Sequence, residues 1–515
     1  MLPGTAVARP GPSAEPPGRG FIAAGRAPGK RGGPSPDRGP CLHPRMAPDI
    51  ERAAAALAAR VPEPLRPLAR LAYDLRWSWL PGAAEAFAAI DPEGWERAEH
   101  NPVELLLTAD AAALDAAARD AALTARAGEL AARAAAERER PGEPAGAPGA
   151  IAFLCAEYAV HRSLPIYSGG LGALAGDLLK QASDQDVDLV AVGLLYREGY
   201  FRQRIDQSGW QQESWVDRDP RRLATVPVTG PGGAPLVVTV PIGGRDVAAR
   251  VWRVQVGRVP LYLLDTDRPE NDPVDRWITA RLYVGDPDLR LAQYLVLGVG
   301  GVRALDALGL APRVLHLNEG HAAFASLELV AQERRAGADL DGALAAARAR
   351  TVFTTHTPVP AGNDTYAPEQ VAAAAGPLAE RVGLGVDGLL RLGRNHPDDG
   401  GEPFGVTQFA LRTSRAANGV SRRHGEVARQ MWQGLWPGRS ADAVPIGSVT
   451  NGVHVPTWVG APMRALLDRH LGDGWWRRAA DPRTWAALDA VPDEELWRVR
   501  EQQRRALVEH ARARG

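Results

Sequence analysis

The stretch Leu164-Pro-Ile-Tyr-Ser-Gly-Gly-Leu-Gly172, continued by Gly176-Asp-Leu-Leu-Lys180, decides the fold of the chain around it. A short apolar run, Ile151-Ala-Phe-Leu-Cys155, precedes it, and a helical pattern follows. The order strand, glycine turn, helix brings unpaired N–H groups and a partial positive charge to the start of the helix. We therefore expect an anion such as a phosphate to bind at this turn.

The glycines alone do not identify the ligand. Their spacing differs from the dinucleotide-binding fingerprint, whose third glycine would come one residue before Gly176. A Walker loop is excluded as well, because no Gly-Lys-Ser/Thr follows. A tight turn without any ligand remains the alternative interpretation.

Composition narrows the class of protein. The chain has 515 residues, 45% of them hydrophobic and 23% charged, which is typical of a multi-domain globular protein. Its net charge of −1 gives no indication of nucleic-acid or membrane binding, and no apolar run is long enough to span a bilayer. Two cysteines, Cys41 and Cys155, fit neither a disulfide framework nor a metal site, which favours the cytoplasm. The chain has two lysines, Lys30 and Lys180.

The sequence divides into five expected segments. Residues 1–48 are rich in Pro, Gly and Arg and are expected to be a disordered leader, either a transit peptide or the product of a start codon assigned upstream of Met46. Residues 49–138 predict a helical domain, residues 139–150 a linker, residues 151–485 an α/β domain, and residues 486–515 further helix.

The α/β domain is predicted from alternating strands and helices. Strands are expected at residues 188–195, 237–242, 251–256, 259–264, 313–318, 350–355 and 446–450, and helices at 291–308 and 319–333. Such alternation predicts a mostly parallel sheet covered on both faces, with ligands at the carboxyl ends of its strands.

Polar residues follow several of these strands and are the candidates for a crevice lining. They are Glu157, Asn318, Glu319, His321, His356 and Asn451. Each also has a purely structural interpretation: His356 as a buried histidine bonded to backbone, and Asn451-Gly452 as a turn. For Lys180 we expect surface exposure or an ion pair with a neighbouring aspartate. No metal site is expected, because no carboxylate–histidine set has suitable spacing.

A series of ordered motifs carries a resemblance to a known family. They are Ser163-Leu-Pro-Ile-Tyr-Ser-Gly-Gly-Leu-Gly-Ala-Leu-Ala-Gly-Asp-Leu-Leu-Lys180, Val192-Gly-Leu-Leu-Tyr-Arg-Glu-Gly-Tyr-Phe-Arg-Gln203, Gly209-Trp-Gln-Gln-Glu213, Asp265-Thr-Asp-Arg-Pro-Glu-Asn271, Leu315-His-Leu-Asn-Glu-Gly-His321, Phe353-Thr-Thr-His-Thr-Pro358, Asn418-Gly-Val-Ser-Arg-Arg-His424 and Val449-Thr-Asn-Gly-Val-His454. From about residue 50 to about residue 470 the chain resembles the α-glucan (glycogen/maltodextrin) phosphorylases, especially their short bacterial branch with an extra N-terminal helical domain.

The resemblance implies a GT-B fold, in which two Rossmann-like domains face a cleft, and phosphorolysis of α-1,4-glucan by orthophosphate to glucose 1-phosphate. It also implies pyridoxal phosphate on a lysine of the second domain, the cofactor's phosphate acting as acid and base. Gly169, Gly170 and Leu171 then match the glycine loop beside phosphate and glucose. His356 matches the catalytic-site histidine that contacts the glucosyl unit, Asn451 matches an asparagine that bonds a glucose hydroxyl, and Glu157, Glu319 and His321 match the lining of the glucose pocket.

The chain also departs from the family pattern. Neither lysine matches the cofactor lysine, and the motifs of the second domain are absent, so we expect a fragment that is inactive alone. The partners implied are α-1,4-glucan and orthophosphate, with no nucleic acid and no membrane, and a homo-oligomer is compatible. A glycogen synthase-like transferase is disfavoured because Ser168 occupies the position of that family's lysine. A non-catalytic glucan-binding half-enzyme is the other alternative.

Overall fold

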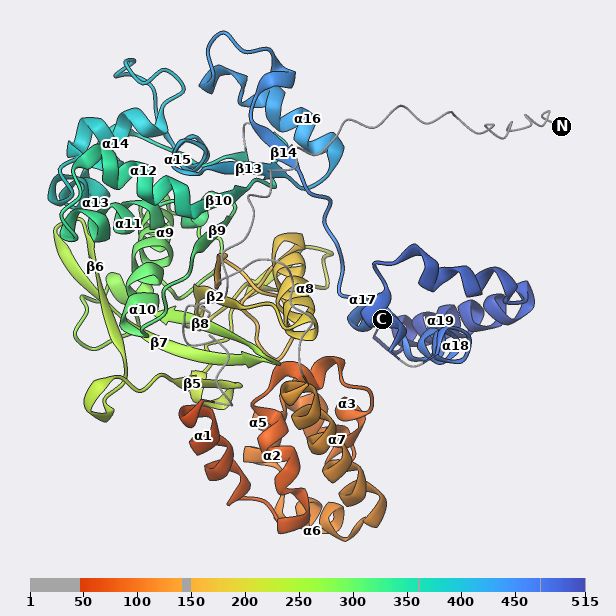
Figure 1. Cartoon of the computed structure of the whole chain (residues 1–515). Helices are drawn as coiled ribbons and strands as arrows, with labels where there is room; N and C mark the ends of the chain where they lie inside the picture. Colours follow the sequence, from red (N-terminus) through yellow and green to blue (C-terminus); the bar gives the residue numbers. More distant parts are fainter. Residues whose placement is uncertain (1–46, 141–149, 360–361, 473, 515) are drawn as a thin grey trace, which may run out of the picture. The chain divides into compact units, whose positions relative to one another are not determined.

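The computed structural model describes residues 47–140, 150–359, 362–472 and 474–514 (Figure 1). Lys30, Cys41 and most of the expected leader and linker lie outside these residues. The last two residues of the expected leader belong to the first helix instead, because Ala47 is buried and caps a helix that begins at Pro48.

The N-terminal region is helical, as the sequence predicts. Its helices are α1 (Pro48–Ala58), α2 (Arg66–Ala72), α3 (Ala83–Ala88), α4 (Pro92–Arg97), α5 (Pro102–Thr108), α6 (Ala111–Arg119) and α7 (Ala121–Glu139). Tryptophans form part of its core, since Trp77 is 1% exposed and its ring meets that of Trp95 edge-on, with 5.9 Å between the ring centroids. After α2, the Asp74 side chain accepts a hydrogen bond from the Arg76 N–H and starts a separate 3₁₀ turn, Leu75–Trp79.

An α/β region with a mostly parallel sheet follows, which confirms the coarse fold prediction. Among the described residues, ten strands form this sheet in the order β14-β13-β10-β9-β1-β2-β8-β7-β5, with β6 beside β7. The bounds are β14 (Ile446–Ser448), β13 (Ala416–Gly419), β10 (Thr351–Thr354), β9 (Val314–Asn318), β1 (Ile151–Leu154), β2 (Leu189–Leu194), β8 (Val259–Asp265), β7 (Arg245–Val256), β5 (Thr225–Pro227) and β6 (Val237–Ile242). Pairing is parallel from β14 to β8 and antiparallel around β7.

The remaining elements connect and flank this sheet. The helices are α8 (Gly170–Gln185), α9 (Pro287–Leu295), α10 (Gly301–Ala307), α11 (Ala325–Arg335), α12 (Leu340–Arg350), α13 (Pro368–Arg381), α14 (Gly385–Gly393), α15 (Val406–Thr413), α16 (Arg422–Met431), α17 (Val455–Trp458), α18 (Ala461–Leu471) and α19 (Asp493–Arg514). The short antiparallel pairs are β3 (Arg202–Ile205) with β4 (Gln211–Ser214) and β11 (Thr365–Tyr366) with β12 (Phe404–Gly405).

One expected helix begins later than predicted. The sequence pattern places a helix at residues 319–333, but α11 starts at Ala325, after the 3₁₀ turn Gly320–Ala322. The reason is the backbone of Glu319, whose φ of 70° and ψ of 172° are incompatible with a helix.

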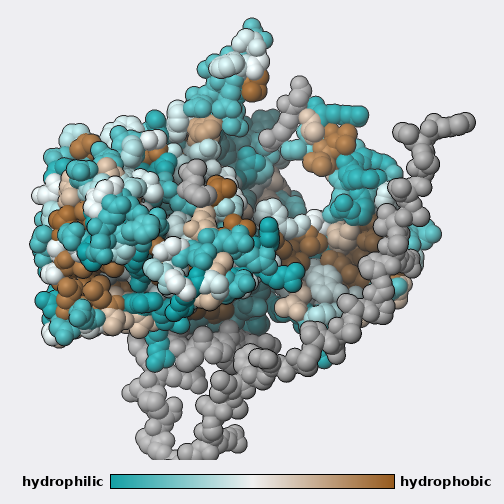
Figure 2. Space-filling model, turned by 90° about the horizontal axis from the view of Figure 1, so that it is seen from above, coloured by the Kyte–Doolittle hydropathy of each residue, from teal (hydrophilic) through white to brown (hydrophobic). Residues whose placement is uncertain are grey.

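The surface shows no dominant apolar area in the view of Figure 2, where hydrophobic spots are scattered among hydrophilic residues. Individual large apolar side chains are nevertheless exposed, including Trp210 at 73%, Val449 at 65% and Trp458 at 61%. In the part of the chain that the structure describes, no helix has the length and apolar character needed to cross a membrane.

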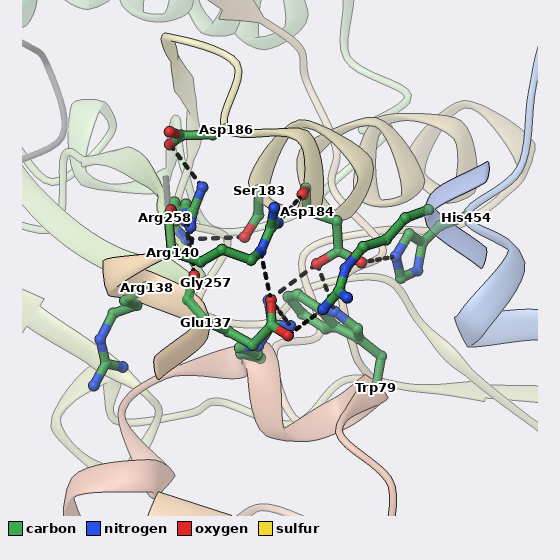
Figure 3. A network of polar contacts seen from close by, with 12 residues as sticks. Trp79, Glu137, Arg138, Arg140, Ser183, Asp184, Asp186, Gly257, Arg258 and His454 are labelled. Atoms are coloured by element: carbon green, nitrogen blue, oxygen red, sulfur yellow. Dashed lines mark hydrogen bonds and ion pairs between the residues drawn. The ribbon is translucent and has the colours of Figure 1, made fainter. Parts of the chain in front are cut away.

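A buried ion-pair network joins the helical region to the α/β region (Figure 3). Asp184, near the end of α8, accepts hydrogen bonds from Arg76 at 3.0 Å and Trp79 at 3.3 Å, and its second oxygen lies 3.2 Å from Nε2 of His454. Burial opposes ionisation of this carboxyl, but the bond to His454 and the charge of Arg76 hold its pKa below the usual range. Asp74, which is 0% exposed, accepts from Arg138 at 2.6 Å and from the Gly257 N–H at 2.9 Å.

Helix α8 also holds the turn that contains α17. Asp177 accepts from the His454 N–H at 3.0 Å and from the Trp458 indole at 2.6 Å. Lys180 is 2% exposed and donates to the Thr457 hydroxyl at 3.1 Å. Of the two expectations for Lys180, surface exposure is wrong, because the lysine anchors this turn. The charge of the neighbouring Asp177 does favour the ammonium form, but burial outweighs it and lowers the pKa of Lys180 to about 8.

Removing Asp184 tests this network. We expect Asp184→Ala to lower the free energy of unfolding by about 3–5 kcal/mol, because Arg76, Trp79 and His454 lose a shared partner and Arg76 is left with Glu137 at 3.6 Å. The matched control is Glu426→Ala, which breaks the exposed pair with Arg423 at 3.2 Å and is expected to cost about 0–1 kcal/mol. Urea unfolding followed by tryptophan fluorescence measures both. Equal midpoints for the two variants would contradict the stabilising role of the network.

Candidate functional site

The site lies where the strand order reverses. From β1 the chain proceeds to β2 on one side and later crosses to β9 on the other, which makes the gap between the carboxyl ends of β1 and β9 a topological switch point. Glu157 follows β1, Glu319 follows β9 and His356 follows β10. The sequence therefore predicted correctly that these residues share one edge of the sheet.

A cavity of about 420 Å³ opens at this edge. Its lining includes Leu171, Tyr283, Arg290, Tyr294, Glu319, His321, His356, Asn363, Asp364 and Thr407. Of the residues named from the sequence, Leu171, Glu319, His321 and His356 thus line it. The volume lies within the range that is typical of small-molecule binding sites.

Glu157 fixes the glycine turn beside the cavity. It is 1% exposed, and its Oε2 accepts hydrogen bonds from the N–H groups of Ser168 at 2.7 Å and Gly169 at 3.2 Å. Its Oε1 accepts from the hydroxyl of Tyr283 at 2.5 Å. A Cβ at Gly172 would lie 2.6 Å from the same carboxylate, so glycine is required there. Glu157 therefore touches the cavity through Tyr283 and holds the turn in place.

The turn leaves the N-terminus of α8 without a cap. The helix begins at Gly170, and no side chain caps it at Gly169. The first N–H groups of a helix have no intrahelical acceptor, so they are available to an anion together with the helix dipole. A Cβ at Gly169 or Gly170 would meet nothing within 4 Å. The fold itself does not require these two glycines, which favours close approach by a ligand as their role.

Glu319 binds the backbone of the loop that follows β10. Its Oε2 accepts from the N–H groups of His356 at 2.7 Å and Thr357 at 3.1 Å, and burial raises its pKa. Its backbone occupies a region of φ and ψ that is almost reserved for glycine, a strain of the kind that collects at functional sites. Because its carboxylate is occupied by the neighbouring loop, Glu319 acts on the cavity mainly by placing His356.

His356 is a neutral imidazole at the cavity wall. Its Nε2 lies 2.7 Å from Oδ1 of Asn318. Burial, together with repulsion from His424, His321 and His316, lowers its pKa to about 4. At neutral pH the ring can therefore exchange hydrogen bonds with a hydroxyl but carries no charge.

The opposite wall contains residues that sequence reasoning missed. Arg290 and Tyr294, one helical turn apart on α9, both bond Asp364, with 2.7 Å between the guanidinium and the carboxylate. The ring of Tyr294 meets that of His321 edge-on at 5.1 Å. Among the described residues, Nδ1 of His321 is buried without a hydrogen-bond partner, and burial lowers the pKa of this histidine to about 4. The i, i+4 spacing of Arg290 and Tyr294 was the available signal.

Asn451 lies apart from this group. It is exposed, its N–H donates to the Val420 carbonyl at 3.0 Å, and it does not line the cavity. Its role at the site remains a prediction, as do the roles of the other residues named from the sequence.

The fold and site define an α/β protein with a small-molecule cavity at the switch point of its sheet, beside an uncapped helix N-terminus. Residues 61–164 match a family described as a protein of unknown function, DUF3417. The chain is 40% identical over 465 residues to the maltodextrin phosphorylase of Thermococcus litoralis, covering 88% of this chain and 54% of that protein.

Two further relatives carry related names. The glycogen phosphorylase of Mycobacterium tuberculosis is 44% identical over 479 residues, covering 88% of this chain and 55% of that protein. The glycogen phosphorylase of Aquifex aeolicus is 36% identical over 445 residues, covering 86% of this chain and 63% of that protein. The chain is thus homologous to the maltodextrin and glycogen phosphorylases along most of its length, which confirms the resemblance, and it spans about half the length of these relatives.

Substitution by alanine distinguishes the glycine that packing requires from the glycine that it does not require. Gly172→Ala should lower the free energy of unfolding by about 1–3 kcal/mol, because the new methyl group collides with the Glu157 carboxylate. Gly170→Ala should change it by less than about 0.5 kcal/mol, because its methyl group meets open space. Thermal unfolding of the two variants checks this, and equal destabilisation would be evidence against the described packing of Glu157.

The buried histidines predict acid sensitivity. Burial lowers the pKa of His161 to about 3 and those of His316 and His356 to about 4, from an ordinary value of 6.5. Between pH 6.5 and 4 the unfolded chain binds protons that the folded chain does not, so stability is full above pH 6.5 and falls as the pH drops. Urea midpoints at pH 7.5 and pH 5 should show this loss. His316→Gln, which can still donate to Thr354, should weaken the dependence, and identical midpoints at both pH values would contradict it.

Proposed function

We propose that the chain provides the glucose- and phosphate-binding domain of an α-1,4-glucan phosphorylase of the GT-B type. The reaction would transfer the terminal glucose of glycogen or maltodextrin to orthophosphate and release glucose 1-phosphate. One observation carries the proposal: in a chain homologous to phosphorylases, the cavity at the switch point adjoins the uncapped N-terminus of α8.

The cavity offers what a glucose unit requires. Glucose hydroxyls both donate and accept hydrogen bonds, and the wall presents a neutral imidazole at His356, the amide of Asn363 and the hydroxyl of Thr407. Glu319 holds the backbone that carries His356, and Glu157 holds the glycine turn beside the cavity. In this proposal they position the sugar for attack, and the chain contributes by orientation and electrostatics.

The N-terminus of α8 is the proposed phosphate site. Its free N–H groups and dipole favour a dianion, and the open space at Gly169 and Gly170 lets oxygen atoms reach the backbone. Leu171 belongs both to this first turn and to the cavity lining. A phosphate at the helix and a glucose unit in the cavity would therefore lie next to each other, as phosphorolysis requires.

Pyridoxal phosphate does not fit the described residues. The cofactor needs a lysine amine that is free at the site, but Lys180 is buried, bonded to Thr457 and faces the Trp79 ring at 5.7 Å. It also does not line the cavity. We therefore place the cofactor lysine outside the described residues.

The segment around Asn451 is the proposed contact with the second GT-B domain. Val449, Val453 and Trp458 are 65%, 63% and 61% exposed on either side of this asparagine. Exposed apolar side chains that follow one another closely along a segment are compatible with an interface. In the proposal, docking of the second domain brings Asn451 toward the sugar.

A glucan-binding module without catalysis is the second candidate. It is favoured by the same finding that no lysine among the described residues is placed to hold the cofactor. The two functions differ in what happens when a second GT-B domain is supplied. An enzyme half would release glucose 1-phosphate from maltodextrin after addition of a relative's second domain and pyridoxal phosphate, whereas a binding module would only bind.

Binding of glucose 1-phosphate to the purified chain tests the shared requirement. We expect saturable heat release in a calorimetric titration, and Gly170→Val should weaken it about tenfold, or about 1.4 kcal/mol, because the side chain covers the N–H groups. The matched control is Gly128→Val, on the exposed face of α7, where a Cβ also meets open space. Absence of binding by the unaltered chain, or equal affinity of the Gly170 variant, would overturn the proposed phosphate site.

A further inference from the structure

Three polar side chains form a row beneath the cavity, one from each of three neighbouring strand ends. Cys155 follows β1, Asn318 ends β9, and His356 follows β10. Sγ of Cys155 lies 3.2 Å from Nδ2 of Asn318, whose Oδ1 lies 2.7 Å from Nε2 of His356. Cys155 is 0% and Asn318 1% exposed, so water does not compete for these bonds.

The Cys155 thiol determines which atom donates and which accepts in each hydrogen bond of this row. Burial raises the pKa of Cys155 to about 12, so the sulfur keeps its proton. The S–H donates to the carbonyl oxygen of Glu157, with 3.1 Å between sulfur and oxygen. The lone pairs of the sulfur therefore remain for an N–H donor. This selects the amide orientation in which Nδ2 of Asn318 faces the sulfur and Oδ1 faces the histidine.

The amide in turn sets the proton on the imidazole. An amide oxygen can only accept a hydrogen bond, so Nε2 of His356 must carry the proton. The ring is neutral at physiological pH and has a single N–H, which leaves Nδ1 bare. Among the described residues, Nδ1 of His356 has no hydrogen-bond partner, and the ring lines the cavity.

We infer that Cys155 and Asn318 are positioning residues that hold His356 in its Nε2-protonated tautomer, so that Nδ1 offers a lone pair to a hydroxyl donor in the cavity. The inference rests on the proposed function for the identity of that donor, a hydroxyl of the bound glucose unit. A hydroxyl that donates to Nδ1 keeps its own lone pairs for N–H donors elsewhere on the wall. The opposite tautomer would present an N–H and reverse this orientation.

The tautomer can be measured directly. The full chain is labelled with ¹⁵N-histidine, and two-bond ¹H–¹⁵N correlation spectra are recorded at pH 7.5 without glucan or phosphate. His356→Gln identifies the signals of this ring by their loss. We expect the Nδ1 resonance at the position of a bare nitrogen and the Nε2 resonance at that of a protonated one. A protonated Nδ1 would overturn the inference.

Substitutions in the row test its cause. Cys155→Ser keeps a donor and an acceptor and should preserve the tautomer. Cys155→Ala and Asn318→Ala should each move both ¹⁵N resonances of His356 toward the average of the two tautomers. If His356 keeps its pattern in both alanine variants, the row does not set the tautomer and the inference fails.

The same spectra contain controls for folding. His316 bonds Thr354 at 2.8 Å and His454 bonds Asp184, so their signals should stay unchanged in a folded variant. If an alanine variant fails to fold, the tautomer of His356 measured in the unaltered chain still tests the inference. Because no ligand is added, the result is separate from any failure of the glucose 1-phosphate titration.

Discussion

A carboxylate that is buried away from water must receive hydrogen bonds or a cation, and this requirement joins segments of the chain that are far apart in sequence. Glu157 accepts hydrogen bonds from backbone N–H groups of the glycine turn, and Glu319 accepts them from the loop after β10. Asp184 forms an ion pair with Arg76 of the helical region. Each of these contacts fixes the position of a loop whose own sequence would allow many conformations, and the cavity is formed between loops held in this way.

Helix α8 connects two of these contacts. Its first turn faces the proposed phosphate, while Asp177, Lys180 and Asp184, spaced three and four residues apart on one face, hold the turn that follows Asn451. A rigid helix therefore sets the distance between the glycine turn and the segment that carries Asn451. Movement of either one would have to be accompanied by movement of the helix.

Local patterns in the sequence were sufficient for most strands of the sheet and for part of the cavity lining. Glu157, Glu319 and His356 could be placed because each directly follows a strand and parallel strands end at one edge. Arg290 and Asp364 could not, because they meet only after α9 crosses to the switch point and the loop after β10 folds back.

Other differences also have physical causes. The strand Ala416–Gly419 was missed because Ala-Ala-Asn-Gly has little strand propensity, and its place in the sheet comes from pairing with β10. The helix after β9 was placed too early because periodicity cannot reveal the strained backbone of Glu319. The pairing of two GT-B domains depends on chain beyond the described residues, so it could be inferred only from the resemblance.

The burial of Lys180 has a consequence for protein chemistry. Lys180 carries the sole lysine amine among the described residues, and Thr457 and the Trp79 ring shield this amine. Reagents that acylate amines would therefore find little to attack in the folded part of this molecule. Burial lowers the pKa of this amine to about 8, and that shift is lost when the contact opens, so the uncovered amine reacts as an ordinary exposed lysine. Its rate of acylation would therefore act as an internal clock for opening of the contact between α8 and the turn after Asn451.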